Sequence, residues 1–257
     1  MRKKLTVNLI SALFWLAVWQ AASAAVASPL LLPGPVSVAK RLLELGATSQ
    51  FWQTSGISLL RILLGIFAAL ILGVLTAVVC FRFRLARAVI SPVINIIKAT
   101  PVASFIMLAL LWLDRNVLPV FITVLIALPV VHSNVSGGML AIDRGLWQVC
   151  RSFGFGFWKK IRILYIPSVF PYFLSACRSS LGLAWKAGVA AEVLAVPAVS
   201  IGKMIYGSKM YLETTDLFAW SAVVIVLSVI IENVICALFH GRAGVMKGRA
   251  GKKHAVF

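Results

Sequence analysis

The stretch ILLGIFAALILGVLTAVVCF, residues 62–81, is apolar on every side of a helix and contains no charged residue. A helix that crosses a bilayer needs about 20 such residues, whereas a strand of a membrane barrel would alternate apolar and polar residues over about 10 positions. The stretch therefore predicts a transmembrane helix. Since 61% of the 257 residues are hydrophobic and only 12% are charged, the whole chain has the composition of a polytopic membrane protein.

Several other blocks match this pattern, and we expect an all-α protein with about six transmembrane helices. The candidate spans cover residues 5–27, 57–81, 88–113, 117–140, 163–197 and 217–239. The fifth block is long for one span and short for two. Two spans would place the basic C-terminal tail outside, so we interpret the block as one span. Pro167 and Pro171 would then mark its start, where proline is best tolerated.

The distribution of basic residues predicts the orientation. The net charge is +18, and cytoplasmic loops of membrane proteins accumulate Lys and Arg. With the N-terminus inside, most basic residues fall in cytoplasmic segments, and few fall outside: Lys40, Arg41, Arg115, Lys203 and Lys209. We therefore expect both termini to be cytoplasmic. The charges form separate patches between spans, which argues against a nucleic-acid-binding surface.

The chain divides into four predicted segments. Residues 1–28 form the first span, although the basic start and the small residues ASAAVAS at 22–28 also fit a cleavable signal peptide. We favour a retained span, because the apolar stretch exceeds a usual signal core of about 7–15 residues. An extracytoplasmic segment at 29–56 and a membrane core at 57–240 follow, and a basic cytoplasmic tail occupies 241–257.

Motifs for catalysis and metal binding are missing from the sequence. It has no phosphate loop of the form GxxxxGK[ST], no HExxH and no GxSxG. The four cysteines, Cys80, Cys150, Cys177 and Cys236, form no CxxC pair, and we interpret them as small apolar side chains. We therefore expect no cofactor or metal in this chain and no catalysis of bond chemistry.

Residues 143–167, DRGLWQVCRSFGFGFWKKIRILYIP, form a basic and aromatic segment between two apolar blocks. Gly154 permits a turn. The neighbouring aromatic residues offer apolar surface for a partner's groove, and the basic residues could meet an acidic rim. The alternative is an interfacial amphipathic helix whose aromatic rings lie among lipid headgroups, and physical reasoning alone leaves both open.

The spacing in this segment resembles the cytoplasmic signature of permease subunits of bacterial ATP-binding-cassette (ABC) importers. That signature reads Glu-Ala-Ala, three residues, Gly, nine residues, then Ile-x-Leu-Pro. Here Gly154 is followed by nine residues and then by LYIP at 164–167. The Glu-Ala-Ala positions hold QVC at 148–150, which departs from the signature and removes its glutamate.

The wider sequence resembles the nitrate, sulfonate and taurine branch of these permeases. LLLPGPVSVAKRL at 30–42 resembles its Leu-Pro-x-Pro segment, and SLLRILLG at 58–65 resembles its Ser-x-x-Arg-x-x-x-Gly span. PSVFPYFLSACRSSLGLAWKAGVAAE at 167–192 resembles its Leu-Pro-x-x-x-Pro-Tyr segment, which ends in Ala-Glu. The resemblance covers roughly residues 30–240 and is specific to the family rather than to one substrate.

The resemblance implies a type I importer permease of the MetI-like fold in the bacterial inner membrane. Its implied partners are two ABC ATPase subunits that bind ATP and Mg, a second permease copy and an extracytoplasmic solute-binding protein. The cargo would be a small solute such as nitrate, a sulfonate, taurine or another small metabolite, moved by alternating access. We call residues 143–167 the coupling segment, and its predicted ATPase-coupling residues are Gln148, Arg151, Ser152, Phe153, Gly154, Phe155, Phe157, Trp158, Lys159 and Pro167.

Charged residues inside spans are costly, so each should be paired on a neighbouring helix, reach the membrane surface with its charged end, or contact the cargo. The predicted spans contain Arg61, Lys98, Arg178, Lys186, Glu192 and Glu232. Glu192 is poorly spaced for a pair with Lys186 on one helix, so we expect partners on neighbouring helices. In KATPVAS, residues 98–104, the proline predicts a kink that could line a cavity. The candidate translocation-path residues are Lys98, Thr100, Pro101, Ser104, Lys186 and Glu192.

Two other functions remain open from the sequence. An autonomous ion-coupled secondary transporter would use the membrane carboxylates and cations as coupling sites. A membrane enzyme is the other alternative, but no nucleophile with a nearby base is evident. Transport without any ATPase would favour the secondary transporter.

Overall fold

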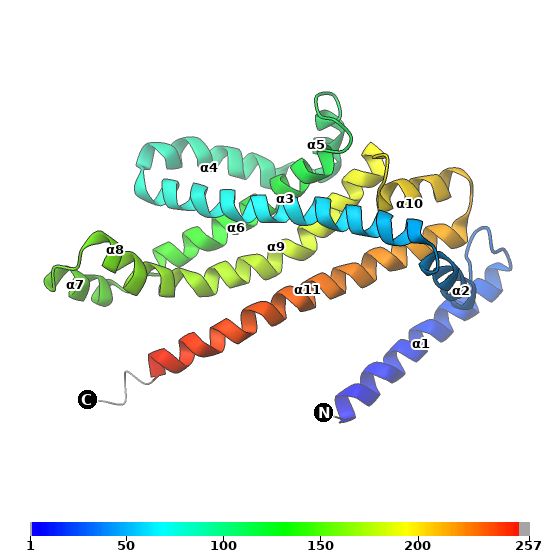
Figure 1. The fold of residues 1–257 in the computed structure, drawn as a ribbon, viewed down its shortest axis with the longest axis horizontal. Coiled ribbons are helices and arrows are strands. Elements are labelled where there is room, and N and C mark those ends of the chain that lie inside the picture. Colours follow the sequence, from blue (N-terminus) through cyan, green and yellow to red (C-terminus); the bar gives the residue numbers. More distant parts are fainter. Residues whose placement is uncertain (1, 252–257) are drawn as a thin grey trace.

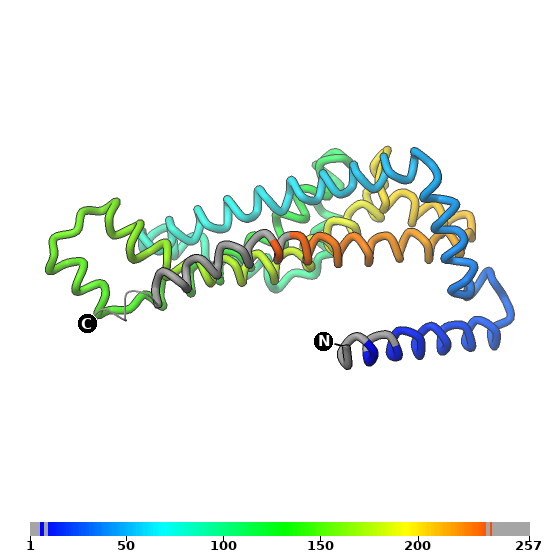
Figure 2. The backbone as a smooth tube through the Cα atoms, turned by 60° about the horizontal axis from the view of Figure 1, so that its bottom comes forward, coloured from blue at the N-terminus to red at the C-terminus, as the bar shows by residue number. Residues whose placement is uncertain are grey.

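A computed structural model describes residues 2–251, and the side chains within this range except at 2–5, 8–9, 235–236 and 238–251. All regular elements of the described part are helices (Figure 1). The long helices run roughly along one axis, and short helices lie at the two ends (Figures 1 and 2). The all-α prediction is therefore confirmed. The expectations for Met1, for Cys236 and for the basic tail side chains at 242–253 lie outside the described residues.

The first two helices form a separate arm on the body of the molecule. Helix α1, Arg2–Val26, runs away from the other helices and leads to α2, Pro35–Gly46 (Figure 1). The Trp19 indole stacks on Phe218 with ring centroids 5.9 Å apart, and its Nε1 donates to the Pro33 carbonyl at 3.1 Å. In α2, Arg41 forms an ion pair with Asp216, with Nε 2.6 Å from Oδ1. These contacts attach the arm to helix α11, Thr214–Gly251.

Helix α3, Ser49–Arg82, begins before the predicted span start at residue 57, where the Thr48 hydroxyl accepts a hydrogen bond from the Phe51 amide. Buried small residues recur along it at every fourth position: Gly65, Ala69, Gly73 and Ala77. A Cβ at Gly73 would lie 2.6 Å from the Cβ of Val131 in helix α6, Leu118–Leu140. Such a row of small residues lets two membrane helices approach closely. The register of α3 against α6 is therefore set by residue size.

The predicted span 88–113 is not one continuous helix. Helix α4, Arg84–Ala99, and helix α5, Val102–Ala109, are bent by 105° at Thr100 and Pro101. Thr100 has an extended backbone, and Pro101 lacks the amide that a continuing helix needs. The kink predicted at Pro101 is thus a complete break, so this block is a broken span or a re-entrant loop.

The long fifth block forms one helix, as predicted. Helix α8, Phe157–Lys160, leads through a π-helical turn, Ile161–Tyr165, into α9, Ile166–Ala195. At the centre of the bundle, Trp185 of α9 is buried beside Ile62, Ala127 and Ala184. Its indole Nε1 donates to the Val224 carbonyl of α11 at 3.0 Å. Helix α9 is therefore packed among α3, α6 and α11.

Among the described residues, three helices are long and apolar enough to cross a membrane, and the bent α4–α5 pair could form a fourth span. These three helical stretches are Ser49–Arg82, Leu118–Leu140 and Thr214–Val234. Helix α9 has the length but carries three charged residues, and the apolar part of α1 is shorter, Ile10–Val26. All six predicted blocks thus fall on helices, as a bundle of about six transmembrane helices requires.

Candidate functional site

The coupling segment forms a compact helical turn at one end of the molecule, opposite the end that holds α2 and α10, Ile201–Met210 (Figure 1). Its first helix is α7, Arg144–Ser152. The Asp143 carboxylate caps α7, because its Oδ1 accepts hydrogen bonds from the amides of Gly145 at 2.6 Å and Leu146 at 3.4 Å. An aspartate at this position satisfies amides that have no partner within the helix.

Gly154 ends α7 with a left-handed backbone, at φ +64°. Its amide donates to the Arg151 carbonyl and the Phe155 amide donates to the Cys150 carbonyl, both at 3.0 Å. This pair of bonds is the Schellman arrangement, in which glycine is favoured because it carries no Cβ. A Cβ at Gly154 would have no heavy atom within 4 Å. Backbone conformation, and not lack of space, is therefore the reason for glycine here, and the predicted turn is confirmed.

Three aromatic side chains project from this turn. Phe153, Phe157 and Trp158 are 73%, 71% and 80% exposed. Phe155 is half-buried, and the Lys159 ammonium lies 3.9 Å from its ring centroid, a cation–π contact. Large apolar side chains that project together from a rigid turn indicate a binding surface.

The charge of the turn is strongly positive. Its basic residues are Arg144, Arg151, Lys159, Lys160 and Arg162. The only acidic residue between 143 and 191 is Asp143, which is occupied as the helix cap. The turn therefore combines exposed apolar side chains with several cations, and its electrostatic complement is an apolar groove with acidic residues beside it.

The predicted coupling residues fall into two places. Gln148, Arg151 and Ser152 are exposed on α7, and the segment from Phe153 to Lys159 forms the turn and α8. Pro167 lies apart from them, exposed in the first turn of α9. There it begins a span and does not contribute to the turn.

A second group of predicted residues lies beside the α4–α5 break. The Lys98 ammonium donates to the Ser133 hydroxyl of α6 at 2.6 Å. The Thr100 hydroxyl donates to the Ile96 carbonyl at 2.9 Å and so closes the end of its own helix. Pro101 and Ser104 are exposed. The break therefore leaves the polar side chains of Lys98 and Ser104 exposed on the surface of the bundle, next to α6.

This surface continues onto α9. Ser175, Ser179 and Lys186 are exposed and spaced for one side of the helix. Tyr172 begins the same stripe and lies against α6, where a Cβ at Gly138 would be 2.9 Å from its ring. A Cβ at the preceding residue of α6, Gly137, would have no heavy atom within 4 Å, and Gly137 lies one turn after Ser133, the partner of Lys98. The exposed polar residues of α4 and α9, together with the half-buried Ser133 and Gly137 of α6, make up a surface that we call the polar face.

Glu192 lies elsewhere, fully buried in the bundle. Its Oε1 is 2.6 Å from Arg61 Nη1 and its Oε2 accepts from the Ser58 hydroxyl at 2.7 Å. The Ser58 hydroxyl also accepts from the Ile201 amide at 2.8 Å, and the Gly202 amide donates to Glu192 at 3.3 Å. The cross-helix partner predicted for Glu192 is therefore confirmed. This network ties α3, α9 and α10 together, whereas Lys186 is exposed on the polar face.

The model of one protein family, the inner membrane component of binding-protein-dependent transport systems, matches residues 61–242. The chain belongs to this family. It is the transmembrane permease subunit of an ABC importer, a multi-pass inner-membrane protein that itself catalyses no bond chemistry. In the described residues, no cluster of three or more His, Cys, Asp or Glu could hold a metal ion.

Curated relatives of the permease agree with this assignment. It is 26% identical to the taurine transport system permease protein TauC of Escherichia coli, over 86% of this chain and 82% of that one. It is 26% identical to the putative aliphatic sulfonates transport permease protein SsuC of Bacillus subtilis, over 79% of this chain and 74% of that one. It is 28% identical to the nitrate import permease protein NrtB of Synechococcus elongatus, over 70% of this chain and 68% of that one.

The fold of the permease also resembles a solved structure. The inward-facing MetNI methionine ABC transporter matches at a TM-score of 0.52 and 20% identity, over 77% of this chain and 93% of that chain. This likeness supports the predicted MetI-like fold.

The predictions from the sequence did not identify several residues of these sites. Arg61 was noted as a membrane cation but not as the partner of Glu192. Ser133, Ser175 and Ser179 were not selected, although the helical spacing of the two serines with Lys186 was visible in the sequence. The proximity of Ser133 to Lys98 had no signal in the sequence, because it depends on how α4 folds back against α6.

Proposed function

We propose that the coupling segment of this permease binds an ABC ATPase subunit. The observation that carries the proposal is the turn at Gly154, which presents exposed Phe153, Phe157 and Trp158 among several basic residues. The assembly would contain two copies of this chain and two ATPase subunits. ATP and Mg would be bound by the ATPase, and an extracytoplasmic solute-binding protein would deliver the cargo.

The connections of the turn favour transmission of movement into the membrane. Helix α7 follows α6 after a short link, and α8 runs through the π-helical turn directly into α9. A displacement of the turn by the ATPase would therefore act on α6 and α9 together. Both helices contribute to the polar face, so their rigid-body movement would alternate access along it.

We further propose that the cargo is a small anion that passes along the polar face. Lys98 and Lys186 are exposed at span positions, where contact with lipid would be costly. Serine hydroxyls next to these cations offer hydrogen-bond donors to an oxyanion. Relatives are named for taurine, sulfonates and nitrate, which all carry an anionic oxygen group.

The docking proposal is tested by co-purification of the ATPase with variants of the turn. Gly154→Leu places a side chain on a left-handed residue, at a cost of about 1–2 kcal/mol. If the turn must hold its shape to dock, this cost lowers ATPase binding about 5- to 30-fold. Gly154→Asn should retain most binding, because asparagine tolerates this conformation. Trp158→Ala should weaken binding through loss of apolar contact.

The matched control is Trp112→Ala. Trp112 is 78% exposed, like Trp158, but follows α5, away from the turn. This variant should bind the ATPase as the unaltered chain does. Equal ATPase recovery with all four variants would refute docking at the turn, and cargo transport by proteoliposomes that lack any ATPase would favour the autonomous transporter.

A further inference from the structure

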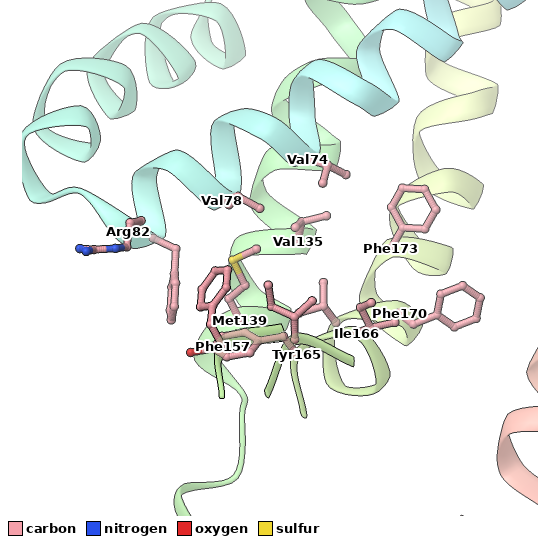
Figure 3. A pocket seen from close by; sticks show the side chains of 13 residues that line it. Val74, Val78, Arg82, Val135, Met139, Phe157, Tyr165, Ile166, Phe170 and Phe173 are labelled. Atoms are coloured by element: carbon pink, nitrogen blue, oxygen red, sulfur yellow. The ribbon is translucent and has the colours of Figure 1, made fainter. Parts of the chain in front are cut away.

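A groove with a volume of about 600 Å³ opens between α3, α6 and α9. Its walls include Val74 and Val78 of α3, Val135 and Met139 of α6, and Phe173 of α9 (Figure 3). Arg82 is the only charged residue among those that line it. A cavity with such walls takes an apolar occupant, because few groups in it could replace the hydrogen bonds of water.

The position of the groove sets its depth in the membrane. Arg82 ends α3, and Phe157, Ile161 and Tyr165 of the adjoining α8 and π-helical turn close the groove at the end that carries the coupling segment. The groove therefore occupies the part of the bundle that faces the cytoplasmic leaflet, on the orientation predicted from the basic residues.

The groove lies on the opposite side of α6 from the polar face. Val135 and Met139 line it, whereas Ser133 and Gly137 belong to the polar face. Ser133 and Gly137 are one helical turn apart, and so are Val135 and Met139. The second pair comes two residues later in the sequence than the first, which places it about 200° further around the helix. The apolar groove is thus separate from the proposed path of the cargo.

One edge of the groove carries a positive charge. Figure 3 shows the Arg82 side chain at this edge with its nitrogen atoms turned outward, and its guanidinium carbon lies 5.2 Å from the centroid of the Phe83 ring. Arg84 and Arg87 follow within the next turn of the chain. Basic pockets between helices at the cytoplasmic side of a membrane attract anionic lipid headgroups.

We propose that this groove binds an anionic phospholipid of the cytoplasmic leaflet, with an acyl chain between α3 and α9 and the phosphate at Arg82. The charge at the rim favours this occupant over an uncharged one. Because Phe157, Ile161 and Tyr165 are also part of the coupling segment, a displacement of that segment changes the shape of the lipid site. Lipid occupancy is therefore linked to the conformation of the permease.

The test measures lipid bound to the purified permease. The chain is reconstituted in nanodiscs of phosphatidylglycerol and phosphatidylcholine, extracted in mild detergent, and its retained lipid is quantified by mass spectrometry. Val78→Trp fills the groove and should remove the retained lipid. Arg82→Gln keeps the apolar walls and should lower the preference for phosphatidylglycerol about fivefold.

Two control variants separate these effects from general changes in surface. Leu75→Trp adds the same bulk to an exposed position of α3 outside the groove, and Lys209→Gln removes an exposed cation of α10, which lies at the other end of the molecule (Figure 1). Both should retain lipid as the unaltered chain does. Unchanged lipid in Val78→Trp and Arg82→Gln would overturn the proposal. A photo-crosslinker at Val78 that captures a second copy of the chain, and no lipid, would also overturn it.

Discussion

At the scale of single residues, the buried pair of Arg61 and Glu192 joins three helices. Both charges are removed from water, so the pair depends on complete hydrogen bonding, which Ser58 and the Gly202 amide supply. Gly202 makes the close approach possible, because a Cβ there would overlap the backbone of Glu192. The pair thus holds α10 against the N-terminal part of α3 and the C-terminal end of α9.

We expect the double replacement of this pair to destabilise the permease much less than the single replacement of Glu192. Glu192→Leu leaves the Arg61 cation without its partner and should lower stability by about 3–5 kcal/mol. Adding Arg61→Met removes the unpaired charge and should recover most of this loss. The measurement is the thermal unfolding midpoint of the purified permease in detergent.

The partly exposed pair of Arg41 and Asp216 provides the comparison. Arg41→Met should change the unfolding midpoint less, because water reaches both side chains of that pair, which are 38% and 16% exposed. A double variant as unstable as Glu192→Leu alone would show that the charges of the buried pair do not determine its contribution.

At the scale of helices, close packing of α3 on α6 depends on small residues. Gly65 faces Thr123 and Gly73 faces Val131, and in each case a Cβ would lie less than 3 Å from the facing Cβ. Neither glycine is needed for backbone conformation, since both lie within a regular helix. Their role is to allow contact across the interface.

Gly73→Leu should therefore separate α3 from α6 and lower stability by about 1–3 kcal/mol, the usual cost of overpacking. The same replacement at Gly56, also in α3, has open space around its Cβ and should be neutral or slightly stabilising. Detergent size-exclusion profiles and unfolding midpoints would measure the difference. Similar losses at both positions would contradict a packing role for Gly73.

At the scale of the whole molecule, the two ends hold different elements. The coupling segment lies at one end, and α2 and α10 lie at the other (Figure 1). Between them, α6 carries the polar face on one side and the apolar groove on the other. This division fits a subunit that contacts a partner or an aqueous path on one side and lipid on the other.

The predicted orientation can be measured by cysteine labelling in a cysteine-free background. A membrane-impermeant maleimide should label Lys209→Cys in intact spheroplasts, because α10 would be extracytoplasmic. Gln148→Cys should react only after the membrane is permeabilised, because α7 would be cytoplasmic. Both positions are exposed, so burial would not limit the reaction. The reverse pattern would overturn the orientation.

The sequence predicted the helices better than their contacts. All six apolar blocks fall on helices, α9 is one helix, and Gly154 forms the expected turn. The short helices α2 and α10 were not predicted, and neither was the size of the bend at Pro101. Both shortfalls have one cause: apolar length identifies spans, but short helices and bend angles depend on the packing around them.

The sequence by itself determined the membrane-spanning class, the likeness to importer permeases and the place of the coupling turn. Hydrophobic length, charge distribution and glycine spacing are local properties, and each can be read along the chain. Only the tertiary structure decided that Glu192 pairs with Arg61, that Lys98 meets Ser133, and that a groove opens behind the polar face. These features depend on the register and rotation of helices against each other, which side-chain packing sets between residues far apart in the chain.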